Sequence, residues 1–545
     1  MLREIRCNKF HQRAIQFHNG LNVVLGAEDA LNSIGKSTAL LAIDFALGGN
    51  SYVSDDLKEN VGDHIVEFSF QFGNDIYYFS RSTDNIEMVN KCDSSYRPVE
   101  IWKKEQYAQW LKEKYGCGNT SISFREIVSL YSRIYGKGNA TENKPLNIVS
   151  EETKSKAIRR LLGVFEVLDD LEALEQAKDE AETKVKVMSD AASEEVIVVH
   201  KSKKSKQEIE ERLQLIDQEI MGIQSQISSG RCSLTEEQLQ VVSDMYEERE
   251  QFNAHLMRRE ARLRRLNRSA DDLRKEYEVN IEELREFFPA VNMQQLENVN
   301  NFHHQLSDIL AAEVKTQIRD TECAIRTLKE QIADIDKKIS AVLEATDENA
   351  TQMALKRLMD RAAEQERLKI EYQYAQDFEK WKSKKKQTKE TFEARQEELL
   401  RSVESRLNRT MEAYSRNINP RKNPPQLELT SNNYTFECEN DKGTGTRYAG
   451  VIILDLSVLQ LTMLPILIHD NVLFKNIEDS TISKLVSFYQ GFPDKQIFIS
   501  MDKVSHYDRE TSRVLQNAAV LQLGRGESAL FGSQWNENGL SLFEV

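Results

Sequence analysis

The sequence predicts an α/β head that is divided by a long antiparallel coiled-coil insertion. Three observations lead to this prediction. A strand, a polar loop and a helix are indicated at 21–47, and the middle of the chain repeats apolar residues in steps of three and four. An apolar run ending in Asp470 lies near the carboxyl terminus. We expect residues 1–150 to form the first half of the head, 151–416 the arms, and 417–545 the second half.

The first motif reads Asn32-Ser33-Ile34-Gly35-Lys36-Ser37-Thr38. A strand that leads through a glycine-bearing loop into a helix leaves backbone N–H groups unpaired at the helix start, where the dipole also favours an anion. In the G-x-x-x-x-G-K-[ST] motif, the lysine reaches the β and γ phosphates and the hydroxyl binds Mg²⁺. Lys36 and Ser37 would take these roles. Ala30 stands where the first glycine belongs and the nearest upstream glycine is Gly26, so the loop is longer than usual.

Composition narrows the class of protein. Charged residues make up 30% of the chain and there are only eight prolines, which favours solvated helices. The net charge of −15 excludes a global attraction to nucleic acid, so any such contact needs local basic patches. The six cysteines include no C-x-x-C pair, and the amino terminus lacks an apolar secretion signal. We therefore expect a cytoplasmic protein.

The longest apolar run does not predict a membrane span. Residues 451–468 are interrupted by Asp455, Gln460 and Pro465, which favours a buried helix followed by a buried strand. Nearer the amino terminus, strands are expected at 64–70 and 76–79 and a helical lobe at 99–135. The polar loop at 136–143 either faces nucleotide or only connects two elements.

Two segments of the middle region have the stepping of a coiled-coil seam and can fold back as an antiparallel pair. The first contains Ile209, Leu213, Ile216, Ile220, Ile223 and Ile227, and the second Ile325, Leu328, Ile332, Ile335, Ile339 and Val342. Glycine and proline interrupt the helical pattern near 228–233 and 287–292, and a weaker break lies at 346–349. The sequence leaves open which break is the hairpin tip.

The second half of the expected site is the apolar run at 464–469, which ends in Asp470. A carboxylate at the end of a neighbouring strand holds the Mg²⁺ of a phosphate loop, so Asp470 is predicted as a metal ligand beside Ser37. Upstream, glycines and hydroxyls precede a helix and predict another anion site, placed to meet a nucleotide bound by a partner head. Its residues are Gly443, Thr444, Gly445 and Thr446. The alternative is a loop that merely turns the chain.

These residues resemble the structural-maintenance-of-chromosomes (SMC) and RecN/RecF branch of ABC ATPases. In that branch a coiled coil separates the Walker A and Walker B halves of one head. Three stretches are similar to the bacterial YydD-like group, whose carboxyl-terminal domain has no known function: the motif at 32–38, Phe287-Phe288-Pro289 with Phe302-His303-His304-Gln305-Leu306, and Ile468-His469-Asp470-Asn471-Val472-Leu473-Phe474. The resemblance implies a split ABC-type P-loop ATPase head that binds ATP and Mg²⁺ and forms a homodimer through its heads.

Two departures from the family pattern bear on catalysis. Residues 443–446 stand at the signature loop but lack its Leu-Ser-Gly-Gly pattern, and Asn471 follows Asp470 where the family places a catalytic Glu. An amide is not a general base, so we expect slow hydrolysis, with Lys36 and Asp470 in catalytic roles. Either Glu478 or Asp479, just beyond in the sequence, would accept the proton of the water; the alternative is that both are surface charges. Ser500, Asp502 and, as a weaker candidate, His506 lie where a residue contacting the γ-phosphate is expected. His469 is expected to pack against or hydrogen-bond Asp470.

The arms carry basic stretches that would neutralise DNA phosphates without reading bases, although coiled coils also carry charge for solubility. They are 258–268, Lys201, Lys203, Lys204, Lys206, Lys382, Lys384, Lys385, Lys386 and Lys389. The leading hypothesis is an SMC-like, DNA-associated ATPase in genome maintenance, such as DNA repair, or in anti-phage defence, with a separately encoded effector or nuclease. The alternatives are a nucleotide-gated scaffold with little hydrolysis that regulates a partner protein, and a purely structural coiled-coil protein.

Overall fold

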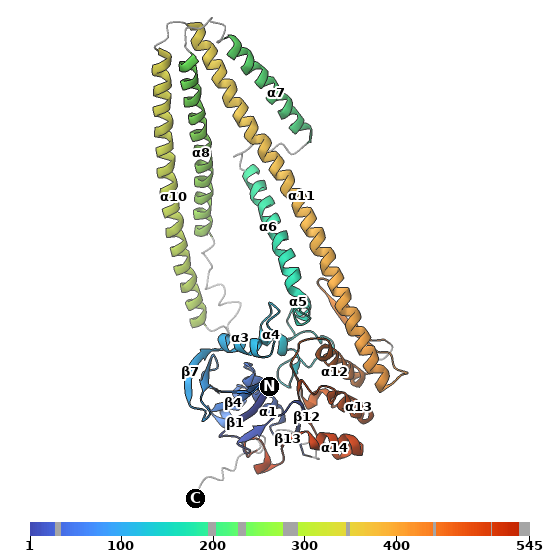
Figure 1. Cartoon of the computed structure of the whole chain (residues 1–545). Helices are drawn as coiled ribbons and strands as arrows, with labels where there is room; N and C mark the ends of the chain where they lie inside the picture. Colours follow the sequence, from blue (N-terminus) through green and yellow to red (C-terminus); the bar gives the residue numbers. More distant parts are fainter. Residues whose placement is uncertain are drawn as a thin grey trace. The chain divides into compact units, whose positions relative to one another are not determined.

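The computed structural model describes residues 1–27, 34–193, 203–226, 236–275, 293–344, 349–439, 443–502 and 504–533. The chain divides into two compact units (Figure 1). We call Met1–Ala177 with Lys389–Val545 the head, and Lys178–Thr388 the arm unit. Asn32 and Ser33 lie outside the described residues, as do the expected breaks near 228–233 and 287–292 and most of the one at 346–349.

A parallel sheet in the head combines strands from both ends of the chain. Its order is β13-β3-β12-β11-β8, from β3 (Gly20–Leu25), β8 (Ser132–Arg133), β11 (Ile466–His469), β12 (Gln496–Met501) and β13 (Ala519–Gln522). Strand β3, which precedes the predicted phosphate loop, pairs in parallel with β12 on one side and β13 on the other. Parallel strands covered on both faces are near-continuously apolar, and β12 is buried along its whole length. The two halves of the head therefore share one sheet, as the predicted fold class requires.

A second, antiparallel sheet comes entirely from the amino-terminal region. Its order is β2-β1-β4-β5-β6-β7, from β1 (Leu2–Cys7), β2 (Ala14–Gln16), β4 (Ile65–Phe72), β5 (Asp75–Ser82), β6 (Met88–Cys92) and β7 (Pro98–Lys103). The strands expected at 64–70 and 76–79 are β4 and β5. The helical lobe expected at 99–135 is wrong at both ends, because β7 and β8 are strands there. In β7, an edge strand, only Trp102 is buried, so its burial gives no alternating pattern from which a strand could be predicted.

Helices cover these sheets. A short β-hairpin forms a third sheet of two strands. The helices are α1 (Lys36–Ala46), α2 (Asp55–Val61), α3 (Lys104–Lys114), α4 (Phe124–Val128), α5 (Lys154–Val164), α12 (Thr444–Leu461), α13 (Asp479–Tyr489) and α14 (Arg509–Asn517), and the hairpin is β9 (Pro425–Leu429) with β10 (Tyr434–Cys438). Helix α12 is buried from Ala449 to Leu459 and leads to β11. The prediction of a buried helix followed by a buried strand is confirmed. No described helix has an apolar stretch long enough to cross a bilayer.

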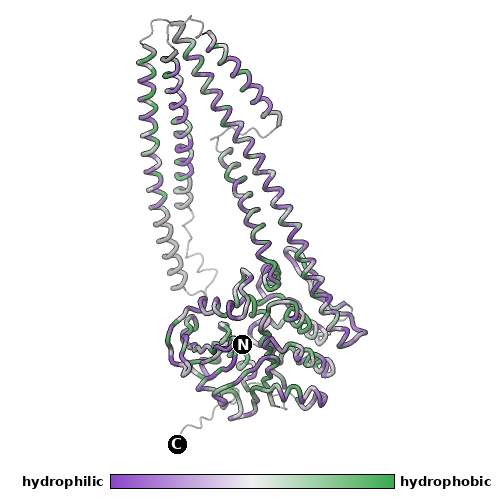
Figure 2. The backbone as a smooth tube through the Cα atoms, viewed as in Figure 1, coloured by the Kyte–Doolittle hydropathy of each residue, from purple (hydrophilic) through white to green (hydrophobic). Residues whose placement is uncertain are grey.

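The long helices are α6 (Leu168–Ser193), α7 (Lys203–Gln226), α8 (Glu236–Lys275), α10 (Met293–Glu344) and α11 (Asn349–Ile418). Hydrophilic residues recur along all of them (Figure 2). Within the arm unit, α7 is antiparallel to α11, because Arg212 pairs with Glu364 and Glu219 with Arg361.

Helix α8 is antiparallel to α10 in the same way, since Arg249 pairs with Asp336 and Glu260 with Lys329. Antiparallel coiled-coil pairing is confirmed, but the expected partners are wrong. The seam beginning at Ile209 faces α11 and the seam beginning at Ile325 faces α8. A heptad pattern identifies the buried stripe of a helix without naming the helix that covers it.

Candidate functional site

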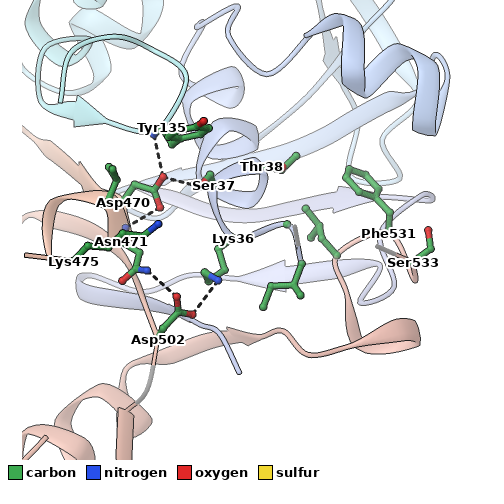
Figure 3. A pocket seen from close by; sticks show the side chains of 14 residues that line it. Lys36, Ser37, Thr38, Tyr135, Asp470, Asn471, Lys475, Asp502, Phe531 and Ser533 are labelled. Carbon is green, nitrogen blue, oxygen red and sulfur yellow. Dashed lines mark hydrogen bonds and ion pairs between the residues drawn. The ribbon is translucent and has the colours of Figure 1, made fainter. Parts of the chain in front are cut away.

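A cavity of about 510 Å³ lies in the head, where the start of α1 meets the carboxyl ends of β11 and β12. Lys36 and Asp470, which are 434 positions apart in the sequence, both line it (Figure 3). Ile34, Gly35, Ser37 and Thr38 line it as well. The described part of the predicted loop and the predicted carboxylate therefore enclose one space.

Asp470 is held by four donors. The hydroxyl of Ser37 donates to Asp470 Oδ2 at 2.6 Å, and the hydroxyl of Ser500 donates to Oδ1 at 2.6 Å. The backbone N–H of Asn471 donates to Oδ1 at 2.8 Å, and that of Tyr135 donates to Oδ2 at 3.0 Å. Asp470 is only 1% exposed. The hydroxyl and carboxylate oxygens are the donor types that Mg²⁺ prefers, so Ser37 and Asp470 fit a magnesium ion.

Lys36 and Asp502 form an ion pair inside the same cavity, with 2.9 Å between Lys36 Nζ and Asp502 Oδ1. The side-chain amide of Asn471 donates to the other oxygen of Asp502 at 2.7 Å. Gly26, the first residue after β3, lies against this pair, since a Cβ there would lie 1.9 Å from Asp502 Oδ1. Asp502, expected in the region of a phosphate-contacting switch, lies beside both Lys36 and Asn471.

The start of α1 has the backbone geometry of an anion site. Gly35 caps the helix with a φ of 94° and without a side-chain capping bond. A positive φ and a Cβ that would lie 2.4 Å from Leu530 Cβ both require glycine at this position. The first N–H groups of an α-helix lack intrahelical partners, and here they follow directly on Gly35 at the cavity wall.

Glu478 and the glycine-rich loop at 443–446 lie elsewhere in the head. Gly443, Gly445, Thr446 and Glu478 line a second cavity of about 470 Å³ between the starts of α12 and α13. Thr444 is the first residue of α12. Glu478 is not among the described residues that line the Lys36 cavity. The structure thus brings the candidate base to the candidate signature loop and leaves Asp502 as the carboxylate beside Lys36.

His469 does not bond Asp470 as expected. Its ring nitrogens lie 2.9 Å from Asp455 Oδ2 and 2.6 Å from the Tyr489 hydroxyl, and Arg133 Nη2 donates to Asp455 Oδ1 at 2.7 Å. Successive side chains of a strand point to opposite faces, which turns His469 away from the cavity that Asp470 lines. Burial lowers the pKa of His469, against the opposing effect of Asp455. The imidazole is thus a neutral link between β11 and its neighbouring helices.

The loop at 136–143 is held against α1. Lys137 Nζ lies 3.1 Å from Asp44 Oδ1, and Arg125 pairs with the same oxygen at 3.0 Å. Burial alone would raise the pKa of Asp44, but these two cations lower it to about 2. No described residue of this loop lines the Lys36 cavity. The structure therefore favours a connecting role.

The sequence reasoning missed several residues that line the cavity, among them Tyr135 and Phe531. Tyr135 follows β8, a strand of two residues that is too short to give a periodic signal. Phe531 lies in a turn near the carboxyl terminus, where nothing in the local sequence indicates a site.

Family models match both ends of the chain. Residues 2–228 match the model described as AAA domain. Residues 412–535 match a model described as an uncharacterised protein conserved in bacteria. Strand β3 and helix α1 lie within the first matched region, and β11 and β12 lie within the second. These matches support the predicted resemblance in two respects: an AAA-type amino-terminal part and a carboxyl-terminal region of an uncharacterised family.

Two Smc head domains are among the solved structures that this chain resembles. One is the Smc head domain with a coiled coil and joint from Pyrococcus yayanosii, at 13% identity, with 96% of this chain and 94% of that chain covered and a TM-score of 0.40. The other is the Smc head domain with an extended coiled coil bound to the C-terminal domain of ScpA, from Pyrococcus furiosus, at 11% identity, 98% and 94% coverage and a TM-score of 0.38. No curated protein matches the chain.

Proposed function

We propose that this protein binds ATP with Mg²⁺ in the Lys36 cavity and hydrolyses it slowly. The observation that supports this most directly is the 2.6 Å contact between Ser37 Oγ and Asp470 Oδ2. It joins a hydroxyl at the start of α1 to a carboxylate at the end of β11, which lies two strands from β3 in the same sheet, and such a pair can hold the metal of a nucleoside triphosphate. The AAA match over 2–228 supports the same class of ligand.

Each residue then has a defined role. Lys36 neutralises the β and γ phosphates, while Ile34, Gly35, Ser37 and Thr38, together with Asn32 and Ser33 from the sequence motif, surround the phosphate chain. Ser37 and Asp470 hold Mg²⁺, which bridges phosphate oxygens and offsets the charge that develops on them. Lys36 already has an anionic partner in Asp502, so the triphosphate competes for its ammonium group.

The attacking water needs a group that accepts its proton. We propose Asp502 for this role within one head, because it lines the cavity and Asn471 orients it. A carboxylate that is also paired with Lys36 is less free to reach water, which supports slow turnover. Glu478 would contribute in trans, if the second cavity and residues 443–446 meet the nucleotide of another head in a homodimer.

A binding and turnover experiment tests this proposal. We expect Lys36→Ala to weaken Mg²⁺–ATP binding by about 100-fold or more, since it removes one partner of a buried charge pair. Lys103→Ala, an exposed lysine on β7, is the matched control. Asp502→Asn should lower kcat by about 100-fold with a small change in affinity. Calorimetry measures the affinity for Mg²⁺–ATP, and phosphate release measures kcat. If Lys36→Ala leaves the affinity for ATP unchanged, the proposed site is wrong.

The alternative is a nucleotide-gated scaffold with little hydrolysis that regulates a partner protein. Asn471 favours it, because the side chain after Asp470 is an amide that bonds Asp502. The two functions predict different turnover. The scaffold is the correct function if two results are obtained together. The wild type binds ATP but releases phosphate no faster than buffer alone, and Asp470→Ala, Asp502→Asn and Glu478→Gln do not change that rate.

The wider role that we propose is that of a cytoplasmic, SMC-like DNA-associated ATPase. Its heads would dimerise on ATP and its arms engage DNA without sequence preference, in genome maintenance or anti-phage defence, alongside a separately encoded effector or nuclease. Support comes from exposed arginines on α8, among them Arg258, Arg262 and Arg265. Spacings of four and three residues place these side chains on one helix face, as a row that can follow a phosphate backbone.

A further inference from the structure

The Lys36 cavity has two chemically different ends (Figure 3). Tyr135, Asp470 and Asn471 lie toward one side of it. Thr38, Phe531 and Ser533 lie toward the other. Ile34 and Leu530, whose backbones are hydrogen-bonded to each other, also line the cavity. The first end contains the groups that fit magnesium and phosphate, and the opposite end presents the aromatic ring of Phe531 beside two hydroxyl groups.

The turn that contains Phe531 is fixed to the phosphate loop. The backbone N–H of Leu530 donates to the carbonyl of Ile34 at 3.0 Å, and the backbone N–H of His11 donates to the carbonyl of Leu530 at 2.8 Å. The Leu530 side chain fills the space that a Cβ on Gly35 would need. This turn comes from the carboxyl-terminal region that matches the uncharacterised family.

The Phe531 ring is supported from behind. It packs edge-on against Phe10 with 5.6 Å between ring centroids, and it lies 6.4 Å from the ring of His64. Phe10 is only 2% exposed. An aromatic side chain whose orientation is set by such contacts loses little conformational freedom when a flat ligand stacks on it.

The direction of a bound nucleotide follows from the end that contains Asp470. The terminal phosphate must lie near the Ser37 and Asp470 oxygens that hold the metal, so the rest of the molecule extends away from Asp470. That direction leads past Thr38 to Leu530 and Phe531. A triphosphate without a base would leave this end of the cavity unused.

We propose that Phe531 forms the base subsite of this cavity and stacks on the ring of a purine nucleotide. The inference rests on the proposed function, because it assumes a triphosphate at Lys36. It assigns a specific task to the carboxyl-terminal region: besides Asp470 and Asp502, that region supplies the surface that distinguishes a nucleotide from a bare polyphosphate.

Paired ligands test the subsite in the full chain. Calorimetry with Mg²⁺ measures the affinity of ATP and of inorganic tripolyphosphate for the wild type and for Phe531→Leu, Phe531→Tyr and Phe488→Ala. Phe531→Leu keeps an apolar side chain against Phe10 and removes the aromatic face. We expect it to weaken ATP binding by about 10-fold and leave tripolyphosphate binding unchanged. Phe531→Tyr should retain the ATP affinity of the wild type.

Phe488→Ala is the matched control, since Phe488 is a partly buried aromatic residue of the same region that packs against Tyr414 outside this cavity. Equal losses for both ligands in Phe531→Leu would mean that the ring only supports the phosphate loop, and would overturn the proposal. Unchanged ATP affinity would overturn it as well. Lys36→Ala separates the two hypotheses: if it leaves both ligands bound, the proposed function itself is wrong.

Discussion

At the scale of single residues, the cavity depends on close packing around one ion pair. Lys36 and Asp502 are each less than a tenth exposed, and Asn471 bonds the carboxylate from the other side. Gly26 makes this packing possible, because a methyl group there would lie 1.9 Å from Asp502 Oδ1 and 2.8 Å from Lys36 Cδ. The glycine that lies too far upstream for the phosphate-loop motif therefore has a steric function.

We expect Gly26→Ala to displace Lys36 and Asp502 and to lower kcat/KM for ATP by on the order of 100-fold, because small misplacements of reacting groups have effects of that size. Steady-state phosphate release measures it. Gly118→Ala is the matched control, since no atom lies within 4 Å of a Cβ at that position. Equal activity of the two variants would contradict a steric role for Gly26.

At the scale of elements, a buried polar network joins four parts of the head around the site. Arg133 of β8, Asp455 of α12, His469 of β11 and Tyr489 of α13 are bonded in series. Burial alone would raise the pKa of Asp455, but the Arg133 guanidinium lowers it, so the carboxylate stays charged. Breaking such a pair leaves a buried charge without a partner, which makes the network a constraint on how β11 presents Asp470.

The network predicts a pH dependence. Burial lowers the pKa of His469 from 6.5, so below about pH 6.5 the unfolded chain binds a proton that the native imidazole does not. The free energy of unfolding should therefore fall as the pH decreases from 7.5 to 5.5. The buried His64 and the amino terminus also have lowered pKa values and act in the same direction. We expect His469→Gln to reduce this slope without removing it.

Urea unfolding at several pH values measures the slope. Tryptophan fluorescence in a Trp381→Phe and Trp535→Phe background reports on the head, because Trp102 and Trp110 then supply the signal. His255→Gln, on exposed α8 surface of the arm unit, is the control. A slope in His469→Gln equal to that of the control would mean that His469 does not titrate differently in the native and unfolded states.

At the scale of the whole molecule, the head and the arm unit differ in how much apolar surface they bury. The head has a large apolar core shared by residues from both chain ends, whereas the arm helices bury narrow stripes and are joined by exposed ion pairs. Exposed ion pairs add little stability, so pairing within the arm unit depends mainly on its apolar seams. This division leaves the charged outer faces of the arms available for binding.

If α8 contacts DNA, neutralising Arg258, Arg262 and Arg265 with glutamine should reduce the slope of log affinity against log salt by about 3. Fluorescence anisotropy with a duplex of arbitrary sequence, between about 50 and 200 mM salt, measures this slope. Lys315→Gln, Arg319→Gln and Arg326→Gln on α10 change the net charge equally and form the control. An equal effect of both triple variants would show that net charge alone matters.

The amino-acid sequence was enough to predict the split α/β head and to single out Lys36, Ser37 and Asp470, which line one cavity; their binding of phosphate and metal stays a prediction. These features depend on local patterns: a strand, a turn and a helix in order, and an apolar run that ends in a charged residue. The existence of long paired helices was equally predictable, because a heptad seam is a property of one helix.

Long-range packing determined the remaining features. Each of them depends on segments that are distant in the chain. They are the position of Asp502 beside Lys36, the position of Phe531 at the cavity, the location of Glu478 in a different cavity from Asp470, and the pairing of the arm helices. A local sequence pattern indicates which side chains must be buried or paired. It does not indicate which distant segment buries or pairs with them, because many segments could do so. Which of them meet depends on the shared parallel sheet, in which β3 lies between β12 and β13.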